Sequence, residues 1–467
     1  RRVLFRSVHR VGDRWFFEVP DSAQQREFLM VSRISGVPEG GSGMAFAGSS
    51  VVERVIRFER VGDRVAVRSQ GYRSVADDSL PIALSVARNN FTPVLASFPI
   101  QAYGRDSASF VLDVTDFFAG DTPAISGVTA AERTQWGVRR FDAARSWISG
   151  IRAFPMNVEV RHVQTFDAAS APGSDRAAAT VSVEMRQSIL LLPKKPMRPR
   201  YADDRAGFFT VERVNYGLDE QKAATQKFIV RWRLEPKDPA AYARGELVEP
   251  VKPIVYYLDP ATPTKWAKYV KEGVEQWQKV FEKAGFKNAI QAKYPPKDDP
   301  NWDMDDARYS VVRWAASLVR NAIGPNTHDP RTGEILNSEI NWYHNHMRSY
   351  RNRLLLETGA ANPAARSLEI PEELMGQTMR MVIAHEIGHA VGFPGHASYR
   401  HRFDSLMAPE AEMFGYALTP LDHKAIRFLY EHLQPGDGPA EGRRAFDAHW
   451  RRSEEHTSEL QSHHDLV

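Results

Sequence analysis

The segment His385-Glu386-Ile387-Gly388-His389 constrains this chain more than any other stretch of its sequence. It stands inside a long helical pattern of apolar residues, and residues four apart lie on one face of an α-helix, so both imidazoles can meet one metal ion. Glu386 is turned round the helix by about 100° from His385, so its carboxylate can reach a water beside that ion but not the ion itself. The spacing predicts a hydrolytic zinc site, in which zinc acidifies a water and Glu386 takes its proton as the water attacks a carbonyl.

The residues around this motif predict a helix with a defined start and end. Pro371, Glu372 and Glu373 suit a first turn, and Gly392 suits the left-handed residue that commonly follows a last turn. The simpler alternative is a core helix whose two histidines are satisfied by hydrogen bonds within the protein. We disfavour it, because a buried apolar helix rarely carries His-Glu-His on one side without a partner for these groups.

Features further along the chain resemble the metzincin clan of zinc peptidases. The extended motif of that clan, H-E-x-x-H-x-x-G-x-x-H, is matched as far as Gly392. The segment S-L-M-A-P at 405–409 is similar to the Met-turn that underlies the zinc, and the helix expected over 419–433 resembles a matrixin-like ending. The resemblance implies that Met407 supports the site without binding the metal.

The third ligand departs from that motif by one residue. The motif places it at Gly395, whereas the histidine follows at His396. Because Gly395 suits a bulge in a loop beyond the helix, we expect His396 to be the third zinc ligand, with His401 as the next choice. A gluzincin-type site would use Glu410 or Glu412, but it would leave the glycine and the Met-turn unexplained. A damaged, inactive site is the remaining alternative.

The two ends of the sequence differ in origin from the rest of the chain, in our interpretation. Residues 1–7 and 452–467 resemble translated sequencing-adapter DNA, so we expect them to be non-native and exclude them from fold reasoning. About 440 residues remain, enough for two or three domains.

The composition excludes several classes of protein. The 61 basic and 58 acidic residues nearly balance, which argues against a nucleic-acid partner. No apolar run is long enough for a transmembrane segment. The absence of cysteine excludes, within this sequence, thiolate ligands and latency through a zinc-bound cysteine.

Patterning divides the remaining chain into three parts and predicts an α+β fold. Residues 8–190 are expected to form a β-rich N-terminal domain, because short strand patterns recur between turn signals. A proline- and arginine-rich stretch opens a region of linker and connecting strands at 191–250. Residues 251–435 are expected to form a metzincin-like zinc peptidase domain, a twisted mixed sheet with the active-site helix. One long amphipathic helix is predicted within it, over 264–284.

Two strands before the zinc helix, at 319–327 and 335–342, are expected to form a hairpin. In the metzincin clan an edge strand above the zinc pairs with the extended substrate. By that resemblance, the substrate edge strand is assigned to Ala322, Ile323, Gly324, Pro325 and Asn326. His328, His344 and His346 could hold a second metal ion, but we favour exposed histidines near a strand end.

The outline of the whole chain is similar to a family of large bacterial zinc-dependent metalloproteases with an uncharacterised N-terminal domain. The resemblance rests on the β-rich N-terminal domain, on residues 201–205 after the proline- and arginine-rich stretch, and on Asp329–Leu336 before the zinc helix. Family members are commonly exported, which implies a periplasmic or extracellular location. We therefore predict a zinc metallopeptidase, an endopeptidase acting on a peptide or protein substrate, with Glu386 as general base. The alternatives are a catalytically inactive binding protein that retains the fold, and a zinc amidase acting on cell-wall peptides.

Overall fold

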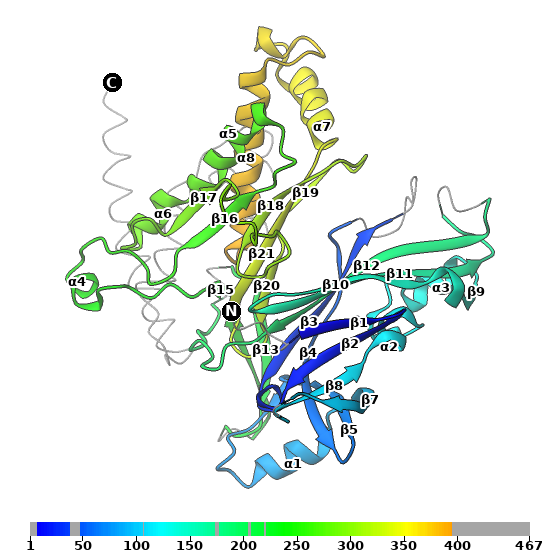
Figure 1. Ribbon diagram of the computed structural model, residues 1–467. Coiled ribbons are helices and arrows are strands. Elements are labelled where there is room, and N and C mark those ends of the chain that lie inside the picture. The colour runs from blue at the N-terminus through cyan, green and yellow to red at the C-terminus, as the bar shows by residue number, and fades with distance from the viewer. Residues whose placement is uncertain are drawn as a thin grey trace. The chain divides into compact units, whose positions relative to one another are not determined.

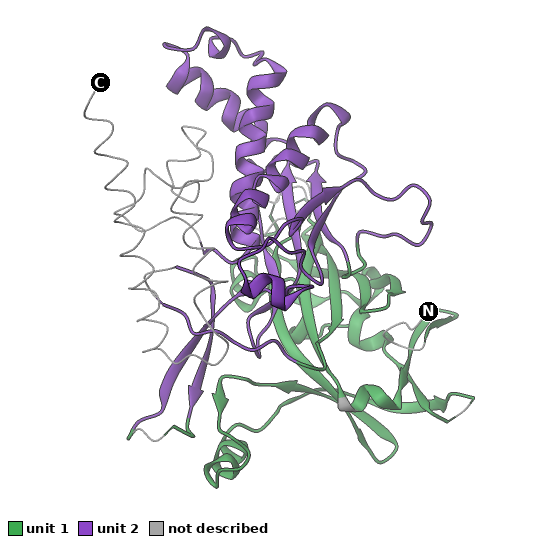
Figure 2. Cartoon of the chain, turned by 90° about the vertical axis from the view of Figure 1, so that its left-hand side faces the viewer, with its two compact units in different colours: residues 1–195, 216–221, 305–308 green, residues 196–215, 222–304, 309–467 purple. Residues whose placement is uncertain are grey.

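The chain forms two compact units, coloured separately in Figure 2. The computed structural model describes residues 7–37, 47–105, 107–172, 177–203, 207–218 and 221–394. Unit 1 comprises residues 1–195, 216–221 and 305–308, and unit 2 comprises residues 196–215, 222–304 and 309–467. The chain is α+β with a β-rich N-terminal region, as the sequence predicts.

Unit 1 consists mainly of strands joined by short helices (Figure 1). Its strands are β1 (Ser7–Val11), β2 (Arg14–Pro20), β3 (Glu27–Gly36), β4 (Ser50–Val61), β5 (Arg64–Gln70), β6 (Ser74–Val75), β7 (Val94–Tyr103), β8 (Ser109–Asp113), β9 (Val138–Phe141), β10 (Trp147–Ala153), β11 (Asn157–Ala168) and β12 (Thr180–Leu191). Its α-helices are α1 (Ile82–Asn89), α2 (Thr115–Ala119) and α3 (Ala130–Gln135), and 3-10 turns lie at Asp21–Gln25, Pro123–Ile125 and Ala143–Arg145.

The large sheet of unit 1 has 11 strands in the order β1-β2-β8-β7-β5-β4-β3-β12-β11-β10, with β9 also paired to β11. The first and last strands of this order, β1 and β10, contact each other, so the sheet curls around its own core. Helix α2 contributes the buried Phe118, whose ring centroid lies 5.9 Å from that of Phe17 on β2. Burial of the apolar residues on the inner face holds this unit together.

Unit 2 contains a smaller sheet and the long helices (Figure 1). Its strands are β13 (Thr210–Asn215), β14 (Ala224–Ile229), β15 (Arg231–Trp232), β16 (Ile254–Leu258), β17 (Ile290–Lys293), β18 (Ser310–Ala315), β19 (Ala322–Ile323), β20 (Asn326–Asp329) and β21 (Glu334–Tyr343). Its α-helices are α4 (Pro239–Ala243), α5 (Thr264–Glu275), α6 (Gln278–Lys283), α7 (His346–Arg353) and α8 (Glu372–Ala390). A π-helical turn at Leu354–Thr358 and a 3-10 turn at Pro363–Ala365 lie between α7 and α8.

The seven-stranded sheet of unit 2 follows the order β15-β21-β18-β16-β17, with β19 and β20 each paired to β21. The strands of the main order are parallel to their neighbours, whereas β19 and β20 run antiparallel to β21. The sheet is therefore mixed. The antiparallel strands form a hairpin with β21 around the turn that the sequence predicts. The first predicted strand, 319–327, is however divided into β19 and β20, because Gly324 and Pro325 are not in a strand.

Helices α5 and α8 cover one face of this sheet. They lie side by side in Figure 1 and contact each other, while α5 also contacts β16 and β17, and α8 contacts β19 and β21. The core between them includes the fully buried side chains of Tyr256, Val274 and Ile387. Packing of both helices against the sheet fixes the position of α8, which carries the histidine motif.

The prediction of one helix over 264–284 was wrong, because the segment is two helices, α5 and α6. The α-helix is interrupted at Gln276 and Trp277, which keep right-handed helical backbone angles, with ψ of Trp277 at −13°. Trp277 is fully buried, and its indole Nε1 donates a hydrogen bond to the carbonyl oxygen of Ala384 at 2.7 Å. A buried indole needs a partner for its N–H, and this requirement coincides with the break in an otherwise continuous amphipathic pattern.

The residues expected to be linker and connecting strands, 191–250, contribute substantially to the core of unit 2. The buried apolar residues that this region adds to that core are Phe208, Val211, Phe228, Ile229, Val230, Trp232, Leu234, Ala241 and Val248. The region also contains the hairpin β13–β14 and helix α4. It therefore supports the fold around α8.

Candidate metal centre

Helix α8 carries the histidine motif in its last turns and buries it. His385 and Glu386 are only 2% and 6% exposed, and His389 is partly buried. Pro371 precedes the first helical residue, and Glu372 and Glu373 occupy the first turn. Acidic side chains there are stabilised by the positive end of the helix dipole. The local sequence thus begins the helix where we predicted, more than two turns before the motif.

The two histidines present their outer ring nitrogens to each other. The Nε2 atoms of His385 and His389 lie 3.2 Å apart, and the ring planes make an angle of 89°. A tetrahedral zinc ion with Zn–N bonds of about 2.0–2.1 Å would separate two such nitrogens by about 3.3 Å. The pair therefore has the separation that two ligands of one zinc ion require.

The second ring nitrogen of His389 is held by the main chain. Its Nδ1 donates to the carbonyl oxygen of Phe393 at 2.9 Å, because a carbonyl can only accept. This hydrogen bond assigns the proton to Nδ1 and leaves the lone pair of Nε2 directed toward His385. A hydrogen bond of this kind orients a metal-binding histidine and makes it a better ligand.

The backbone conformation at the end of α8 places the carbonyl oxygen of Phe393 where it accepts the hydrogen bond from His389. The amide of Gly392 donates to the carbonyl of His389 at 3.1 Å, and the amide of Phe393 donates to that of Gly388 at 3.1 Å. This pair of bonds is a Schellman motif, which needs a left-handed residue at Gly392, and φ of this residue is +123°. A Cβ at Gly392 would lie 2.3 Å from the carbonyl oxygen of Val230. Only glycine meets both requirements.

Two tryptophans hold further carbonyls along the same helix. Trp232 on β15 donates from Nε1 to the carbonyl oxygen of Ala390 at 3.0 Å, and Trp277 does the same to Ala384. The sequence pattern did not identify either role, since an apolar helical or strand pattern does not show where an indole N–H points. Together they fix α8 on both sides of the His-Glu-His group.

The strand segment assigned to the substrate lies against the motif. A Cβ built on Gly324 would be 2.1 Å from the carbonyl oxygen of Glu386. Asn326 donates from its side-chain amide to the carbonyl oxygen of His389 at 3.4 Å. In the part of the chain that the structure describes, β19 and β20 pair only with β21, so this segment is an edge of the sheet beside the motif.

The other predicted site residues have different outcomes. His396, His401, Met407, Glu410 and Glu412 all lie outside the described residues. Among residues 7–394, apart from the gaps given above, no group of three His, Asp or Glu side chains could hold a metal ion. The structure therefore brings together two of the three predicted ligands and does not address the third.

The three histidines considered for a second metal make other contacts. His328 shares a hydrogen bond of 3.0 Å with Asn326, and Nδ1 of His344 accepts from the indole of Trp314 at 3.3 Å. His346 is buried and makes an edge contact with the ring of Tyr350. They do not form a metal-binding group within the described part of the chain.

Comparison with known families gives three matches along the chain. Residues 367–411 match a family model described as Met-zincin (DUF4953), a range that includes His385, Glu386 and His389 as well as His396 and Met407. Residues 5–37 and 48–237 match two families each described as a domain of unknown function (DUF5118 and DUF5117). No curated protein and no solved structure matches the chain. The Met-zincin match supports a metzincin-like zinc peptidase for the short region it covers.

Membrane insertion through a helix has no candidate in the described residues. None of the helices found there combines the length and the apolar character needed to cross a bilayer.

Proposed function

We propose that this chain is a zinc-dependent peptidase, and specifically an endopeptidase. The observation that carries the proposal is the 3.2 Å separation of the Nε2 atoms of His385 and His389 on a buried helix, which suits two ligands of one zinc ion. The Met-zincin match over 367–411 supports it independently.

Three histidines would hold the metal. His385 and His389 would bind through Nε2, and we propose His396 as the third ligand, because it follows shortly after the helix end at Gly392. Met407 would lie beneath the site as a support that does not bind the metal. A zinc ion with three protein ligands keeps a fourth position for water or substrate.

The chemistry of the chain would centre on Glu386. When bound, zinc supplies a Lewis acid that polarises a carbonyl and lowers the pKa of water. Glu386 would take a proton from the attacking water and then deliver it to the nitrogen of the departing amine. Its burial in α8 beside the histidines keeps the carboxylate in an environment with little water, where its electrostatic effect on a reacting group is strong.

The edge at 322–326 would hold the peptide. Among the described strands this segment pairs with β21 alone, so its main-chain groups could add an extended peptide strand, which is β-augmentation. The close approach of Gly324 to Glu386 would place the bound strand beside the proposed base. Such binding recognises the main chain in the middle of a polypeptide, which favours an endopeptidase. We also propose a periplasmic or extracellular location, because the chain resembles large bacterial zinc-dependent metalloproteases whose members are commonly exported.

Zinc content and hydrolysis measured on the same protein test this function. The purified chain should bind one zinc ion per molecule and cleave a quenched fluorescent polypeptide library. Glu386→Gln should keep the zinc and lose roughly 10²- to 10⁴-fold of the rate. Glu282→Gln on α6, an exposed position away from the motif, is the matched control and should change neither quantity.

Each contrary result points to a named alternative. Zinc binding without hydrolysis of any polypeptide would favour the inactive binding protein. Hydrolysis confined to cell-wall peptides would favour the amidase. An unchanged rate in Glu386→Gln would remove the proposed base.

A further inference from the structure

A concave site lies in unit 2 at the end of α8 that is opposite the histidine motif. It has a volume of about 350 Å³ and is bounded by the start of α5, by α7, and by the first turn of α8 with the residues just before it. Ten residues of α8 separate Met375 in this pocket from His385, which is about 15 Å along the helix axis. The pocket is therefore separate from the candidate metal centre.

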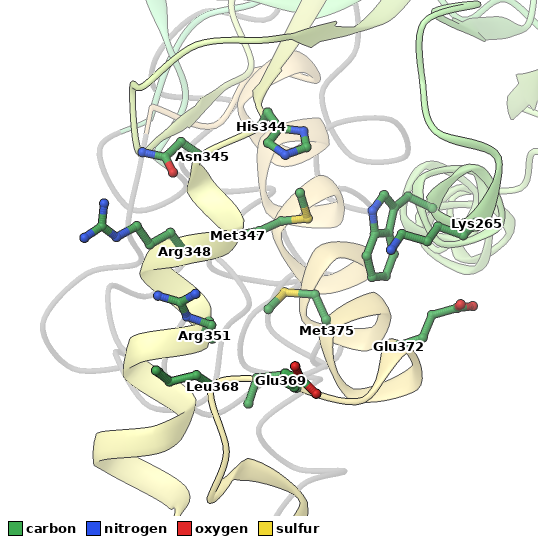
Figure 3. A pocket seen from close by; sticks show the side chains of 12 residues that line it. Lys265, His344, Asn345, Met347, Arg348, Arg351, Leu368, Glu369, Glu372 and Met375 are labelled. Atoms are coloured by element: carbon green, nitrogen blue, oxygen red, sulfur yellow. The ribbon is translucent and has the colours of Figure 1, made fainter.

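The interior of this pocket is apolar and adaptable. Met347 on α7 and Met375 on α8 reach toward each other from facing helices (Figure 3). The other apolar side chains of the lining are Trp266, Leu368 and Ile370. Trp266 and Met375 are each 6% exposed, so this part of the pocket belongs to the packed body of the unit. Methionine side chains are flexible and polarisable, so they adjust to apolar groups of different shapes.

The rim of the pocket is cationic. Lys265 and Arg351 stand on opposite sides of the opening in Figure 3, and Arg348 lies next to Arg351 with its side chain directed outward. Among the described residues, none of these three cations forms an ion pair. Nζ of Lys265 lies 4.7 Å from the ring centroid of its neighbour Trp266, and Arg351, among the described residues, donates hydrogen bonds to the side-chain oxygen of Asn352.

The acidic groups of the rim leave this charge uncompensated. Glu372 already pairs with Lys268 at 3.5 Å. Glu369 is exposed and makes no ion pair with any described residue. Among the described residues, two unpaired cations at the opening, Lys265 and Arg351, therefore face one unpaired carboxylate, and the unpaired Arg348 lies beside them. This balance favours an anionic group at the mouth of the pocket, where opposite charges attract without the cost of full burial.

We propose that this pocket binds a small amphipathic carboxylate, with its apolar part between Met347 and Met375 and its carboxylate between Lys265 and Arg351. The volume is at the small end of the range for ligand sites, which suits a single acyl chain or one large side chain. The same chemistry is found in a free carboxylic acid and in the C-terminus of a peptide that ends in an apolar residue. The proposal does not depend on the peptidase function.

Calorimetry on the full chain tests the proposal with octanoate as the probe. Octanoate should bind at one saturable site, and octylamine, which has the same chain with the opposite charge, should bind at least about tenfold more weakly. The double variant Lys265→Glu/Arg351→Glu should weaken octanoate binding roughly tenfold, since exposed charge pairs each contribute a few-fold. Lys279→Glu, an exposed charge reversal on α6 that does not line the pocket, is the control and should bind octanoate as the parent does.

A further variant and two peptides complete the test. Met347→Trp, at a partly buried position, should fill the pocket and abolish octanoate binding while the chain still melts cooperatively. Acetyl-Ala-Ala-Leu with a free carboxylate, compared with its carboxamide in Glu386→Gln protein, separates the two sources: tighter binding of the acid peptide than of octanoate assigns chain ends, and the reverse assigns free acids. Equal binding of octanoate and octylamine, or binding that survives Met347→Trp in the folded protein, would overturn the proposal, as would the absence of saturable binding by octanoate and by the acid peptide.

Discussion

Gly324 lies directly against the main chain of Glu386. A Cβ built on this glycine would be 2.1 Å from the carbonyl oxygen of Glu386, far inside van der Waals contact. Two residues later, Asn326 donates to the carbonyl oxygen of His389. The edge segment and the motif helix are thus in contact at the residues that the proposed chemistry uses, so the position of one determines the position of the other.

Gly324→Ala should therefore separate the edge segment from α8. The added methyl cannot fit against a main-chain carbonyl, so the strand or the helix must move, at a cost of about 1 to 3 kcal/mol in the free energy of unfolding. We expect lower thermal stability and a loss of peptide hydrolysis larger than the loss of zinc. Gly150→Ala is the control, because an added Cβ there meets nothing within 4 Å. A Gly324→Ala protein as active and as stable as the Gly150→Ala protein would contradict this account.

Trp277→Phe should destabilise unit 2 through one buried hydrogen bond. The substitution keeps an aromatic ring in the core but leaves the carbonyl of Ala384 without the indole N–H that lies 2.7 Å away. Loss of a buried partner costs about 1 to 3 kcal/mol. Urea unfolding followed by circular dichroism measures the change. Trp147→Phe, at a side chain that is 53% exposed, is the matched control and should be nearly neutral.

The helix and its motif follow from short-range rules. Residues 371–373 define the start of α8, the spacing of His385 and His389 places both on one face, and Gly392 ends the helix in the left-handed region. Each of these signals involves residues within one or two turns of each other, so no tertiary information is needed to read them. The hairpin before α8 is predictable for the same reason, since its turn residues lie between two strand patterns.

The hydrogen bonds and the ring contact that hold the end of α8 in place come from residues distant in the sequence, and they could not be predicted. Trp232 bonds a carbonyl 158 residues later in the chain, and Trp277 bonds one 107 residues later. Phe208 stacks on Phe393 with ring centroids 4.9 Å apart, although it belongs to the region expected to be linker and connecting strands. A strand pattern does not show which distant aromatic ring one of its residues will contact. Its role appears only when the fold brings it to the end of α8.

His396→Ala should lower zinc affinity, and His401→Ala should not. Phe393 is next to His389, because its carbonyl accepts from the ring, and His396 is only three residues further along the chain. A metal ligand contributes more than a supporting hydrogen bond, whose loss costs roughly 10- to 100-fold in affinity. Titration with a competing chelator measures the affinities. Loss of zinc in His401→Ala with retention in His396→Ala would show that the one-residue offset had been interpreted wrongly.

Unit 1 contains two buried titratable side chains on β11 whose effects on stability oppose each other. Burial raises the pKa of Glu159 to about 7, helped by the nearby charge of Asp305 and opposed by Arg186. Burial lowers the pKa of His162 to about 3, and its Nε2 accepts a hydrogen bond of 2.9 Å from Gln187. The ordinary pKa values of the two groups are 4.5 and 6.5.

The signs of the two contributions follow from proton linkage. Between pH 4.5 and 7 the folded chain holds a proton on Glu159 that the unfolded chain releases, so this group makes the free energy of unfolding fall as pH rises. Between pH 3 and 6.5 the unfolded chain binds a proton on His162 that the folded chain does not, so this group makes the free energy of unfolding rise with pH. From pH 4.5 to 6.5 the two slopes should nearly cancel.

Glu159→Gln should remove one slope and expose the other. Relative to the parent, its free energy of unfolding should increase by about 1.4 kcal/mol per pH unit between pH 4.5 and 6.5, or on the order of 3 kcal/mol over that range. His162→Gln should show the opposite trend relative to the parent. Urea unfolding at five pH values measures the differences, and groups common to both chains cancel. The exposed Glu53→Gln is the charge control and should run parallel to the parent. A Glu159→Gln profile that also runs parallel to the parent would mean that the buried carboxyl group does not hold its proton in the folded chain.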